Sequence, residues 1–301
     1  MVLLDGKHTA ATIRAEIAER IAALVQSGRR SPRLGIVLVG HNPASETYVA
    51  NKIKACNEVG ITAEKITFED TVSEAELLAR IDALNVDPTM DGYIVQLPLP
   101  AHIDEGRISQ AIDWRKDVDG LTPQNIGRTA LGLPSLISAT PRGIRELLAR
   151  YGIQTAGKHV VVIGRSNIVG KPMAMLLMQR PYLSLPNMTA SALGDATVTV
   201  CHSKTQNLCD ICLSADIIIV AAGQPGLLTA DMVRDGAVVV DVGINRIEDA
   251  AAARGYRLVG DVDFSNVAPK CSFISPVPGG VGPMTIVSLL QNTLQAYEHS
   301  R

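Results

Sequence analysis

The chain has 301 residues, a formal net charge of −2 and a hydrophobic content of 47%. This length is enough for about two domains of ~150 residues, each with its own core. The near-neutral charge, without a basic stripe or a charged tail, argues against a nucleic-acid partner. The longest apolar runs, such as 217–222 and 237–240, have the length of strands, whereas a membrane helix needs ~20 apolar residues. We therefore expect a soluble protein without a nucleic-acid or membrane partner, acting on a small molecule.

Neither the start of the chain nor its cysteines indicate an exported protein. The start, MVLLDGKHTAATIRAE, lacks the long apolar core of a signal peptide. Five cysteines argue against a disulfide scaffold in a chain of this size. Cys209 and Cys212 form a C-x-x-C pair, but no second pair accompanies them as a zinc site would require. They fall within one short helical run with Leu208, Ile211 and Cys212 inward, so packing is preferred over redox chemistry. We predict a cytoplasmic protein without a metal.

The first half alternates strand-like and helix-like runs, as in an α/β fold with a parallel sheet. Predicted strands cover 34–40, 63–68 and 92–96, and predicted helices cover 44–59 and 73–84. Ser73 followed by Glu76 is a capping-box signature, so the second of these helices should begin there.

The second half repeats this alternation and predicts a doubly wound, Rossmann-like domain. Predicted strands cover 158–164, 196–202, 216–223 and 236–243, with helices at 171–180, 206–214 and near 229–234. Turn residues in 121–140 place a domain boundary there, and Thr140 followed by Pro141 should cap and open the next helix. The first domain would be 1–139 and the second 140–282. The final helix, from Pro283 to about His299, would return to the first domain and add 283–301 to it.

A glycine-rich loop follows the first strand of the second domain. The run GRSNIVGKP supplies Gly164, Arg165, Ser166 and Gly170 ahead of a helix. Backbone N–H groups at a helix start favour a phosphate. The loop departs from the dinucleotide fingerprint G-x-G-x-x-G, because serine replaces the second glycine. A tight turn without a ligand therefore stays open as an alternative.

The end of the next strand bears on which dinucleotide would bind. An NAD-binding unit usually places a carboxylate there to hold the ribose 2′-hydroxyl. Here the strand ends in His202, Ser203 and Lys204, which offer donors and a positive charge, and Arg165 adds a second cation. This pattern predicts NADP rather than NAD, unless His202 and Lys204 are simply solvated.

Two kinds of residue suggest a catalytic site in the first domain. Helix 44–59 places Ser45, Tyr48 and Lys52 on one stripe, beside an apolar stripe that includes Cys56. Partial desolvation of Lys52 would favour the neutral amine, which can act as a base or an acid. Tyr48 could orient this amine or stack on a flat ring. The alternative is a lysine whose stem packs while its amine stays in water.

Strand 92–96 brings polar groups to the same end of the sheet. Gln96, Leu97 and Pro98 follow this strand, and ligands in such folds bind at the carboxyl ends of strands. The amide of Gln96 offers both a donor and an acceptor to the edge of a heterocycle. In KDVDGL, the Asp119 carboxylate could hold a pair of N–H groups, although most Asp-Gly pairs only make turns.

These residues belong to six segments that resemble the bifunctional methylenetetrahydrofolate dehydrogenase/methenyltetrahydrofolate cyclohydrolase family. The segments are in the family's order and span nearly the whole chain: Tyr48 to Ile61, Val95 to Pro100, Lys116 to Gly120, Gly164 to Pro172, Asp241 to Arg246 and Pro276 to Thr285. The resemblance implies oxidation of 5,10-methylenetetrahydrofolate by NADP+ and hydrolysis of the 5,10-methenyl product to 10-formyltetrahydrofolate. It also implies a homodimer that uses no metal.

The resemblance also assigns roles by matching position. Lys52 would be the acid/base residue, Tyr48 its stacking and orienting partner, Gln96 its support and Asp119 the anchor of the pterin. Further substrate contacts would come from the residues around the strand end and from a loop lining an interdomain cleft: Leu97, Pro98, Gly279, Gly280 and Pro283. The cofactor would be bound by Gly164, Arg165, Ser166, Ser203 and Ile244.

One segment departs from the family's pattern. Residues 180–195 make a longer connection than is usual in the family. They lie near the residues expected to bind the 2′-phosphate, so the preference for NADP is the prediction that this difference most affects. Three other functions were considered: a monofunctional dehydrogenase, a dehydrogenase of an amino acid or hydroxy acid, and a non-enzymatic nucleotide-binding module. The presence of both Tyr48 and Lys52 argues against the monofunctional enzyme. A dehydrogenase of an amino acid or hydroxy acid would need an arginine for the substrate carboxylate and a catalytic histidine pair, and the sequence shows no such arrangement. A nucleotide-binding module would not need the combination of Tyr48, Lys52, Gln96 and Asp119. No G-x-x-x-x-G-K-[ST] loop of a synthetase domain occurs.

Overall fold

The computed structural model describes residues 1–181, 193–249 and 255–299. The chain folds into two compact units. Unit 1 contains Met1–Ala10 and Thr140–Thr285, and unit 2 contains Ala11–Ala139 and Ile286–Arg301. Two helices, α1 (Gly6–Gln26) and α10 (Val281–His299), contribute residues to both units.

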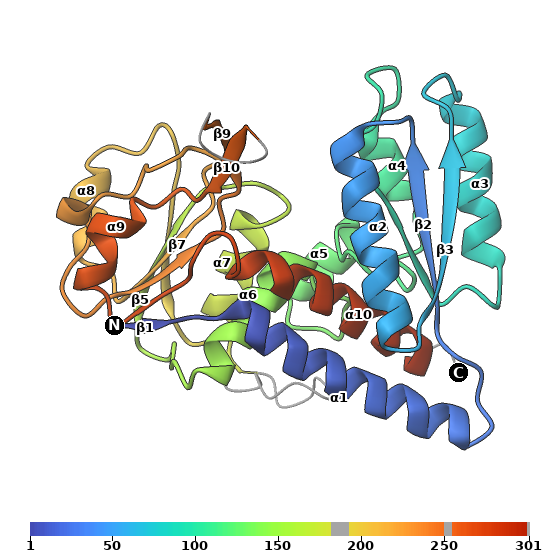
Figure 1. Cartoon of the computed structure of the whole chain (residues 1–301), viewed down its shortest axis with the longest axis horizontal. Helices are drawn as coiled ribbons and strands as arrows, with labels where there is room; N and C mark the ends of the chain where they lie inside the picture. The colour runs from blue at the N-terminus through green and yellow to red at the C-terminus, as the bar shows by residue number, and fades with distance from the viewer. Residues whose placement is uncertain (182–192, 250–254, 300–301) are drawn as a thin grey trace. The chain divides into compact units, whose positions relative to one another are not determined.

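Unit 2 is built on a three-stranded parallel sheet with the order β3-β2-β4 (Figure 1). Its strands are β2 (Arg33–Val39), β3 (Thr62–Phe68) and β4 (Gly92–Val95), and its helices include α2 (Pro43–Glu58), α3 (Glu74–Val86), α4 (Glu105–Ala111) and α5 (Pro123–Ala130). Alternate strand residues such as Val37 and Tyr93 form one core with Leu77 of α3 and Ile108 of α4. Helix α2 packs against β2 and β3.

Side-chain caps fix where the helices of unit 2 begin. The Asn42 side chain accepts hydrogen bonds from the N–H groups of Ala44 and Ser45 at the start of α2. At α3, the Ser73 hydroxyl accepts from the N–H of Glu76, and the Glu76 carboxylate accepts from the N–H of Ser73. The predicted capping box is therefore confirmed.

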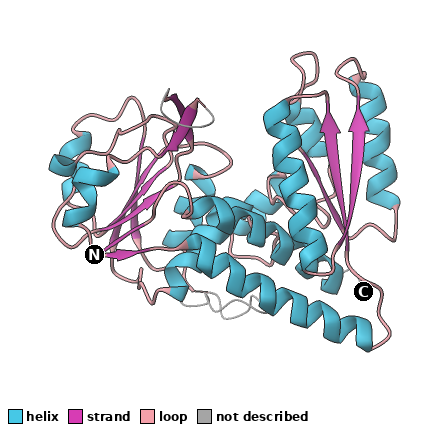
Figure 2. Ribbon diagram, in the orientation of Figure 1, coloured by secondary structure: helices cyan, strands magenta, loops and turns pink. Residues whose placement is uncertain are grey.

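Unit 1 contains a six-stranded parallel sheet with the order β1-β11-β8-β7-β5-β6 (strands in magenta in Figure 2). The strands are β1 (Val2–Leu3), β5 (His159–Ile163), β6 (Thr197–Cys201), β7 (Ile217–Val220), β8 (Val238–Asp241) and β11 (Phe273–Ile274). The helices are α6 (Ala139–Arg150), α7 (Gly170–Met178), α8 (Leu208–Leu213) and α9 (Phe264–Val267). A separate antiparallel ribbon joins β9 (Asn245–Glu248) to β10 (Tyr256–Val259). The predicted α/β class with parallel sheets is confirmed.

The C-terminal helix completes unit 2, as predicted. The Asn292 side chain of α10 donates to the backbone carbonyls of Val118 at 2.7 Å and Ile137 at 2.8 Å. The hydroxyl of Tyr297 donates to the carbonyl of Arg30 at 2.6 Å. These bonds join the end of the chain to three segments far away in the sequence.

Some predicted elements differ from those observed. Helix α6 begins at Ala139, so Thr140 lies inside it rather than at its cap, and its hydroxyl pairs with that of Thr285 at 3.0 Å. The helix predicted near 229–234 is only a short 3-10 turn, Ala230–Met232. Most of 180–195 lies outside the described residues. None of the described helices is long and apolar enough to cross a membrane.

Candidate active site

Helix α2 carries the central group of the site in unit 2. Lys52 is only 7% exposed, more buried than its position at the edge of an apolar stripe predicted. Its Nζ donates to the Gln96 Oε1 at 3.1 Å. The same amine lies 5.5 Å from the centroid of the Tyr48 ring, one turn earlier on the helix. The structure therefore brings together three of the predicted catalytic residues, Tyr48, Lys52 and Gln96.

Gln96 is held at the carboxyl end of β4. Its backbone N–H donates to the Val37 carbonyl at 2.8 Å, and its Nε2 donates to the Leu97 carbonyl at 2.8 Å. Because the amide nitrogen is already bonded to the backbone, the Oε1 atom is the one directed at Lys52. The glutamine thus presents an acceptor to the amine in a fixed orientation.

The remaining side chains near this amine have their acidities shifted by burial. Tyr48 is 39% exposed, yet partial desolvation and then the negative charge of Asp119 raise the pKa of its hydroxyl. Burial raises the pKa of the Cys56 thiol to about 12, so it stays protonated near neutral pH. Neither group is therefore ionised near neutral pH.

The two aspartates of the KDVDGL segment have different environments. Asp117 is 2% exposed and accepts hydrogen bonds from the N–H groups of Gly120 and Thr122 and from the Asn125 side chain. Its burial raises its pKa. Asp119 is half-buried and lines a small cavity of about 50 Å³ that Leu97 also lines. Asp117 thus shapes the turn, while Asp119 remains accessible to a ligand.

The glycine-rich loop in unit 1 follows β5 and opens α7. Gly164 has φ +127°, and a Cβ there would lie 2.2 Å from the Ala221 carbonyl oxygen. A Cβ on Gly170 would lie 2.1 Å from the Gly164 carbonyl oxygen. Ser166, the residue that replaces the fingerprint's second glycine, accepts from the Val169 N–H at 3.1 Å. The close packing of this turn therefore requires both glycines, while Arg165 and Ser166 are exposed at its surface.

The turn after β6 has the composition expected of a site that binds a phosphate. Ser203 and Lys204 are exposed, and His202 and Thr205 close the turn through the bond from the His202 N–H to the Thr205 hydroxyl at 2.9 Å. No carboxylate is present in residues 201–205. The turn thus presents donors and positive charge.

A third group of predicted residues meets in unit 1. Ile244, Gly279, Gly280 and Pro283 line one pocket of about 150 Å³. The sequence analysis assigned Ile244 to the cofactor and the other three to the substrate. The pocket places these two sets side by side. The role of Pro98, which follows Leu97, stays a prediction.

Two buried aspartates that the sequence analysis did not single out support this pocket. The Asp261 carboxylate accepts from the N–H groups of Ala222 and Gly223, directly after β7, at 2.7 and 2.8 Å. Asp241, at the end of β8, accepts from the N–H of Gly243 at 3.0 Å and from that of Asp261 at 2.9 Å. Burial raises the pKa of Asp241 to about 6. An aspartate that ends a buried strand is the signal that could have drawn attention to Asp241.

No group of three or more histidine, cysteine, aspartate or glutamate side chains that could hold a metal is found among the described residues. The chemistry that the site offers is therefore an amine, an amide, a phenol and a carboxylate in unit 2. Unit 1 offers a loop with glycines, a cation and hydroxyl groups. The first set suits proton transfer on a polar ring, and the second suits a phosphorylated cofactor.

Comparison with known proteins identifies both parts of the chain. Residues 4–119 match the family model for the tetrahydrofolate dehydrogenase/cyclohydrolase catalytic domain, and residues 138–301 match that for its NAD(P)-binding domain. The bifunctional protein FolD of Porphyromonas gingivalis is 58% identical over 98% of this chain and 96% of its own. The crystal structure of the bifunctional FolD enzyme from Campylobacter jejuni has a TM-score of 0.89 and 46% identity, covering 99% of each chain.

A further relative was solved with a bound cofactor. The Trypanosoma brucei dehydrogenase-cyclohydrolase, complexed with NADP and an inhibitor, is 37% identical, with a TM-score of 0.89 over 99% of this chain and 98% of its own. These matches confirm the family that the six sequence segments predicted and the fold class that the alternating strands and helices predicted. The chain belongs to the tetrahydrofolate dehydrogenase/cyclohydrolase family.

Proposed function

We propose that the chain oxidises methylenetetrahydrofolate with NADP+ and then hydrolyses the methenyl product to 10-formyltetrahydrofolate. The observation that carries this proposal is the contact of the buried Lys52 amine with the Gln96 Oε1 and with the Tyr48 ring. Family membership supports the pair of activities. The roles of the individual residues are inferred from their geometry.

Lys52 is proposed as the acid/base residue of the hydrolysis. Water adds to the methenyl carbon, the bond from this carbon to one ring nitrogen breaks, and that nitrogen takes up a proton. In its neutral form, Lys52 can accept a proton from the water and return it to the leaving nitrogen. The positive charge of the methenyl group then leaves as a proton released to solvent. Gln96 orients the amine, and the exposed Tyr48 ring offers a surface on which the pterin can stack.

Asp119 is proposed to anchor the pterin for both reactions. A carboxylate can accept two parallel hydrogen bonds from neighbouring N–H groups, and this geometry fixes a planar ring. Its neighbour Asp117 takes no part in binding, because its hydrogen bonds to Gly120, Thr122 and Asn125 use its carboxylate within the turn. Leu97 and Pro98 would contact the same ring.

The residues of unit 1 fit NADP. Gly164 and Ser166 would bring backbone and hydroxyl donors to the phosphates at the start of α7. Arg165, Ser203 and Lys204 would hold the 2′-phosphate, because the turn after β6 has no carboxylate to bind a free ribose hydroxyl. When bound, the cofactor supplies the hydride acceptor. The NADP complex of the Trypanosoma brucei relative supports this choice.

The remaining assignments rest on the resemblance. Ile244 would contact the cofactor, while Gly279, Gly280 and Pro283 would contact the substrate from the shared pocket. We also propose that the chain forms a homodimer, because the resemblance implies one, and that it acts in the cytoplasm.

The test is a two-signal absorbance assay of the purified chain with methylenetetrahydrofolate and either NADP+ or NAD+. We expect reduced cofactor to form with both dinucleotides but faster with NADP+, and methenyltetrahydrofolate supplied directly to disappear faster than it does without enzyme. Formation of methenyl product without enzyme-dependent hydrolysis would refute the second activity. Equal efficiency with NAD+ would refute the cofactor preference.

A further inference from the structure

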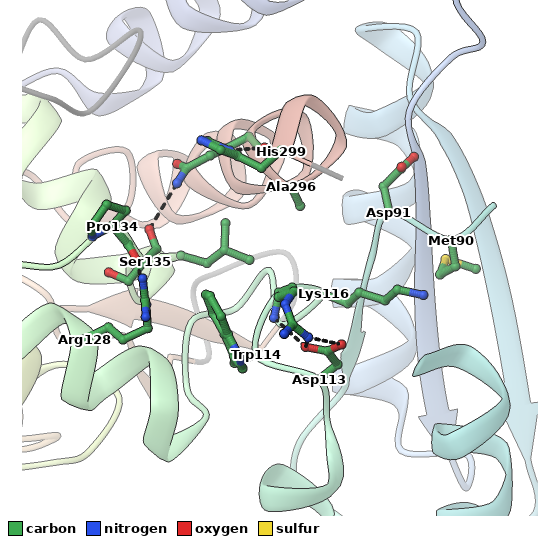
Figure 3. Close-up of a pocket in the computed structure, with 13 residues that line it drawn as sticks. Met90, Asp91, Asp113, Trp114, Lys116, Arg128, Pro134, Ser135, Ala296 and His299 are labelled. Carbon is green, nitrogen blue, oxygen red and sulfur yellow. Dashed lines mark hydrogen bonds and ion pairs between the residues drawn. The ribbon is translucent and has the colours of Figure 1, made fainter. Parts of the chain in front are cut away.

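Unit 2 contains a second pocket, which the proposed reactions do not use. It has a volume of about 510 Å³, within the range of roughly 300–1,000 Å³ that is usual for small-molecule sites. Its walls are drawn as sticks in Figure 3 and include the only tryptophan of the chain, Trp114. Of the pockets described here, it is larger than the two that contain predicted site residues.

This pocket lies away from the Lys52 site. It is lined by Met90 and Asp91, which directly precede β4, whereas Gln96 follows the other end of that strand. The segment that carries Trp114 and Lys116 along its wall continues into Asp119. An occupant would therefore be separate from the folate and would adjoin the segment that bears its proposed anchor.

The acidic groups in the wall are already paired with cations. The Asp91 carboxylate, which is 1% exposed, accepts two hydrogen bonds from the Arg30 guanidinium, at 2.6 and 2.7 Å. Asp113 accepts from the Arg115 Nη1 at 3.1 and 3.3 Å. Each of these carboxylates therefore already has an arginine partner.

Two cations in the wall donate to backbone carbonyls, and one of them, Lys116, also interacts electrostatically with the Asp87, Asp113 and Asp91 carboxylates. The Lys116 amine donates to the carbonyls of Leu84 and Asp87 at the end of α3, at 2.8 and 2.7 Å. The Arg128 Nε donates to the Pro134 carbonyl at 2.7 Å, and its guanidinium lies 4.4 Å from the Trp114 ring centroid, beside that ring in Figure 3. Among the described residues, no carboxylate forms an ion pair with Arg128. The wall thus has more cations than carboxylates, and part of the Arg128 guanidinium remains available to bind a ligand.

The rest of the wall has a polar and an apolar part. Ser135, Gln295 and His299 supply polar groups, whereas Pro134, Leu136 and Ala296 supply hydrocarbon surface in addition to the indole of Trp114. A guanidinium can bond an acidic group in its plane while its face stacks on an aromatic ring. A hydrated inorganic ion would leave the apolar surface of the pocket uncovered, whereas an apolar molecule would leave the cations without a counter-charge.

We propose that this pocket binds an organic anion that has a ring-sized apolar body and one acidic group. The body lies against Pro134, Leu136 and Ala296, and the acidic group accepts hydrogen bonds from Arg128. Lys116 adds positive charge from the end of α3.

The position of Trp114 makes the proposal directly testable, because all the tryptophan fluorescence comes from this pocket. The full-length chain is titrated with anilinonaphthalene sulfonate, a probe with an apolar ring body and one acidic group. Phenylnaphthylamine, which has the same rings without the sulfonate, is the matched neutral probe. We expect the sulfonate to change the Trp114 emission saturably and to bind at least tenfold more tightly than the neutral probe.

A pair of arginine variants locates the binding. Arg128→Gln should weaken sulfonate binding by roughly ten- to a hundredfold, as expected for a lost charged hydrogen bond. Arg107→Gln, which removes an exposed arginine of α4 from the same unit, should leave binding within about twofold. Equal sulfonate affinity of the wild type and Arg128→Gln would overturn the proposal.

A salt series needs no variant and covers the case in which Arg128→Gln does not fold. Binding of the sulfonate should weaken as ionic strength rises, because salt screens the attraction to Arg128 and Lys116. Binding of the neutral probe should not weaken. A sulfonate affinity that does not depend on salt, or that equals the affinity of the neutral probe, would show an apolar pocket without anion selectivity and refute the proposal.

Discussion

Lys52 differs from an ordinary surface lysine in the nature of its partners. Its amine is buried and contacts an amide oxygen and an aromatic ring, neither of which carries a formal charge. A lysine that merely extended its amine into water would be exposed at that atom. The buried position therefore favours the catalytic interpretation over the alternative that the sequence left open.

We expect Lys52→Met to separate the two activities. Methionine keeps most of the volume of the stem and removes only the titratable amine. Hydrolysis of methenyltetrahydrofolate should fall by about 10²-fold or more, the usual contribution of a general acid–base group. The dehydrogenase should fall less, because hydride transfer depends mainly on proximity and orientation. The measurement supplies methenyl substrate directly and follows its loss above the spontaneous rate.

Lys54→Met is the matched control, because Lys54 is an exposed lysine on the same helix. It should leave both activities unchanged. Near-normal hydrolysis by Lys52→Met would show that the base lies elsewhere and that Lys52 only packs its stem.

Asp119→Asn should lower both activities together. The carboxylate of Asp119 only accepts hydrogen bonds, whereas the amide of asparagine both donates and accepts and carries no charge. The pterin would therefore lose its proposed anchor. A loss of one charged hydrogen bond corresponds to roughly ten- to a hundredfold weaker folate binding. Calorimetric titration with a substrate analogue measures this change, and NADP+ affinity should persist. Asp82→Asn, at an exposed position on α3, is the control. Unchanged folate affinity in Asp119→Asn would return this residue to a turn-forming role.

Arg165→Ala should raise the apparent KM for NADP+ far more than that for NAD+. The exposed guanidinium is proposed to bond the 2′-phosphate, which NAD+ lacks, so NAD+ serves as the internal control. The expected change for NADP+ is again roughly ten- to a hundredfold. Steady-state kinetics with both dinucleotides measures it. Equal increases for the two cofactors would mean that Arg165 acts on a part common to both.

The residues of the site differ in how far the sequence could predict them. Tyr48 and Lys52 lie on a helix that follows one strand, and Gln96 lies at the end of another strand. The carboxyl ends of parallel strands meet at one edge of the sheet, so the sequence predicts that the three residues are close together. The hydrogen bonds between Asp241, Asp261 and the loop after β7 could not be predicted in this way. They depend on which strands are neighbours, and the sequence does not specify that order.

At the scale of elements, the buried central strands were predicted because they are apolar runs between turn residues. The short strand β1 at the edge of the sheet and its neighbour β11 were missed, because two residues carry no periodic pattern. Helix α1 was also missed, although Ile13, Ile17 and Ile21 are spaced at four residues and are buried. That pattern was available in the sequence. A helix was predicted near 229–234, but the structure has only the 3-10 turn Ala230–Met232, because the length of such a short element depends on its tertiary contacts.

At the end of β8 in unit 1, the carboxylate of Asp241 becomes a weaker acid on folding. The pKa of Asp241 rises from 3.8 to about 6, chiefly through burial, although three backbone N–H groups partly offset the shift. A raised pKa in the folded state means that this group favours folding below about pH 4. The benefit is lost as pH rises through about 6. Its ionisation at neutral pH therefore costs on the order of 3 kcal/mol of stability.

We expect Asp241→Asn to lack this dependence on pH. The variant loses acceptor capacity, so it has a constant penalty, but the free energy of unfolding of the wild type relative to the variant should decline between about pH 4 and pH 7. Denaturant titrations at several pH values measure the difference. Asp235→Asn, whose side chain is 90% exposed, should show no such trend relative to the wild type. A difference for Asp241→Asn that does not change with pH would refute the proposed titration.

At the scale of the whole molecule, the last helix returns the chain to unit 2. The residues from Ile286 onward belong to the unit that begins at Ala11. Unit 2 therefore contains two parts of the chain that lie far apart in the sequence. The position of the final helix after the second domain predicted this return. The sequence did not identify the contacts that hold the helix, because those bonds join residues more than a hundred positions apart.

Asn292→Ala should weaken the packing of this helix and disturb the folate site together. The buried side chain donates to the carbonyls of Val118 and Ile137, and Val118 directly precedes Asp119. Two buried carbonyls would lose a donor, which should lower the free energy of unfolding by about 2–4 kcal/mol. The KM for the folate should rise several-fold because the segment bearing Asp119 loses its support, while the KM for NADP+ should not change. The control is Gln295→Ala, which removes the bond from the same helix to the Ser135 carbonyl and should leave the KM for the folate unchanged. If the stability of Asn292→Ala fell while the KM for the folate stayed at the wild-type value, the bond to Val118 would hold the fold but not the position of Asp119.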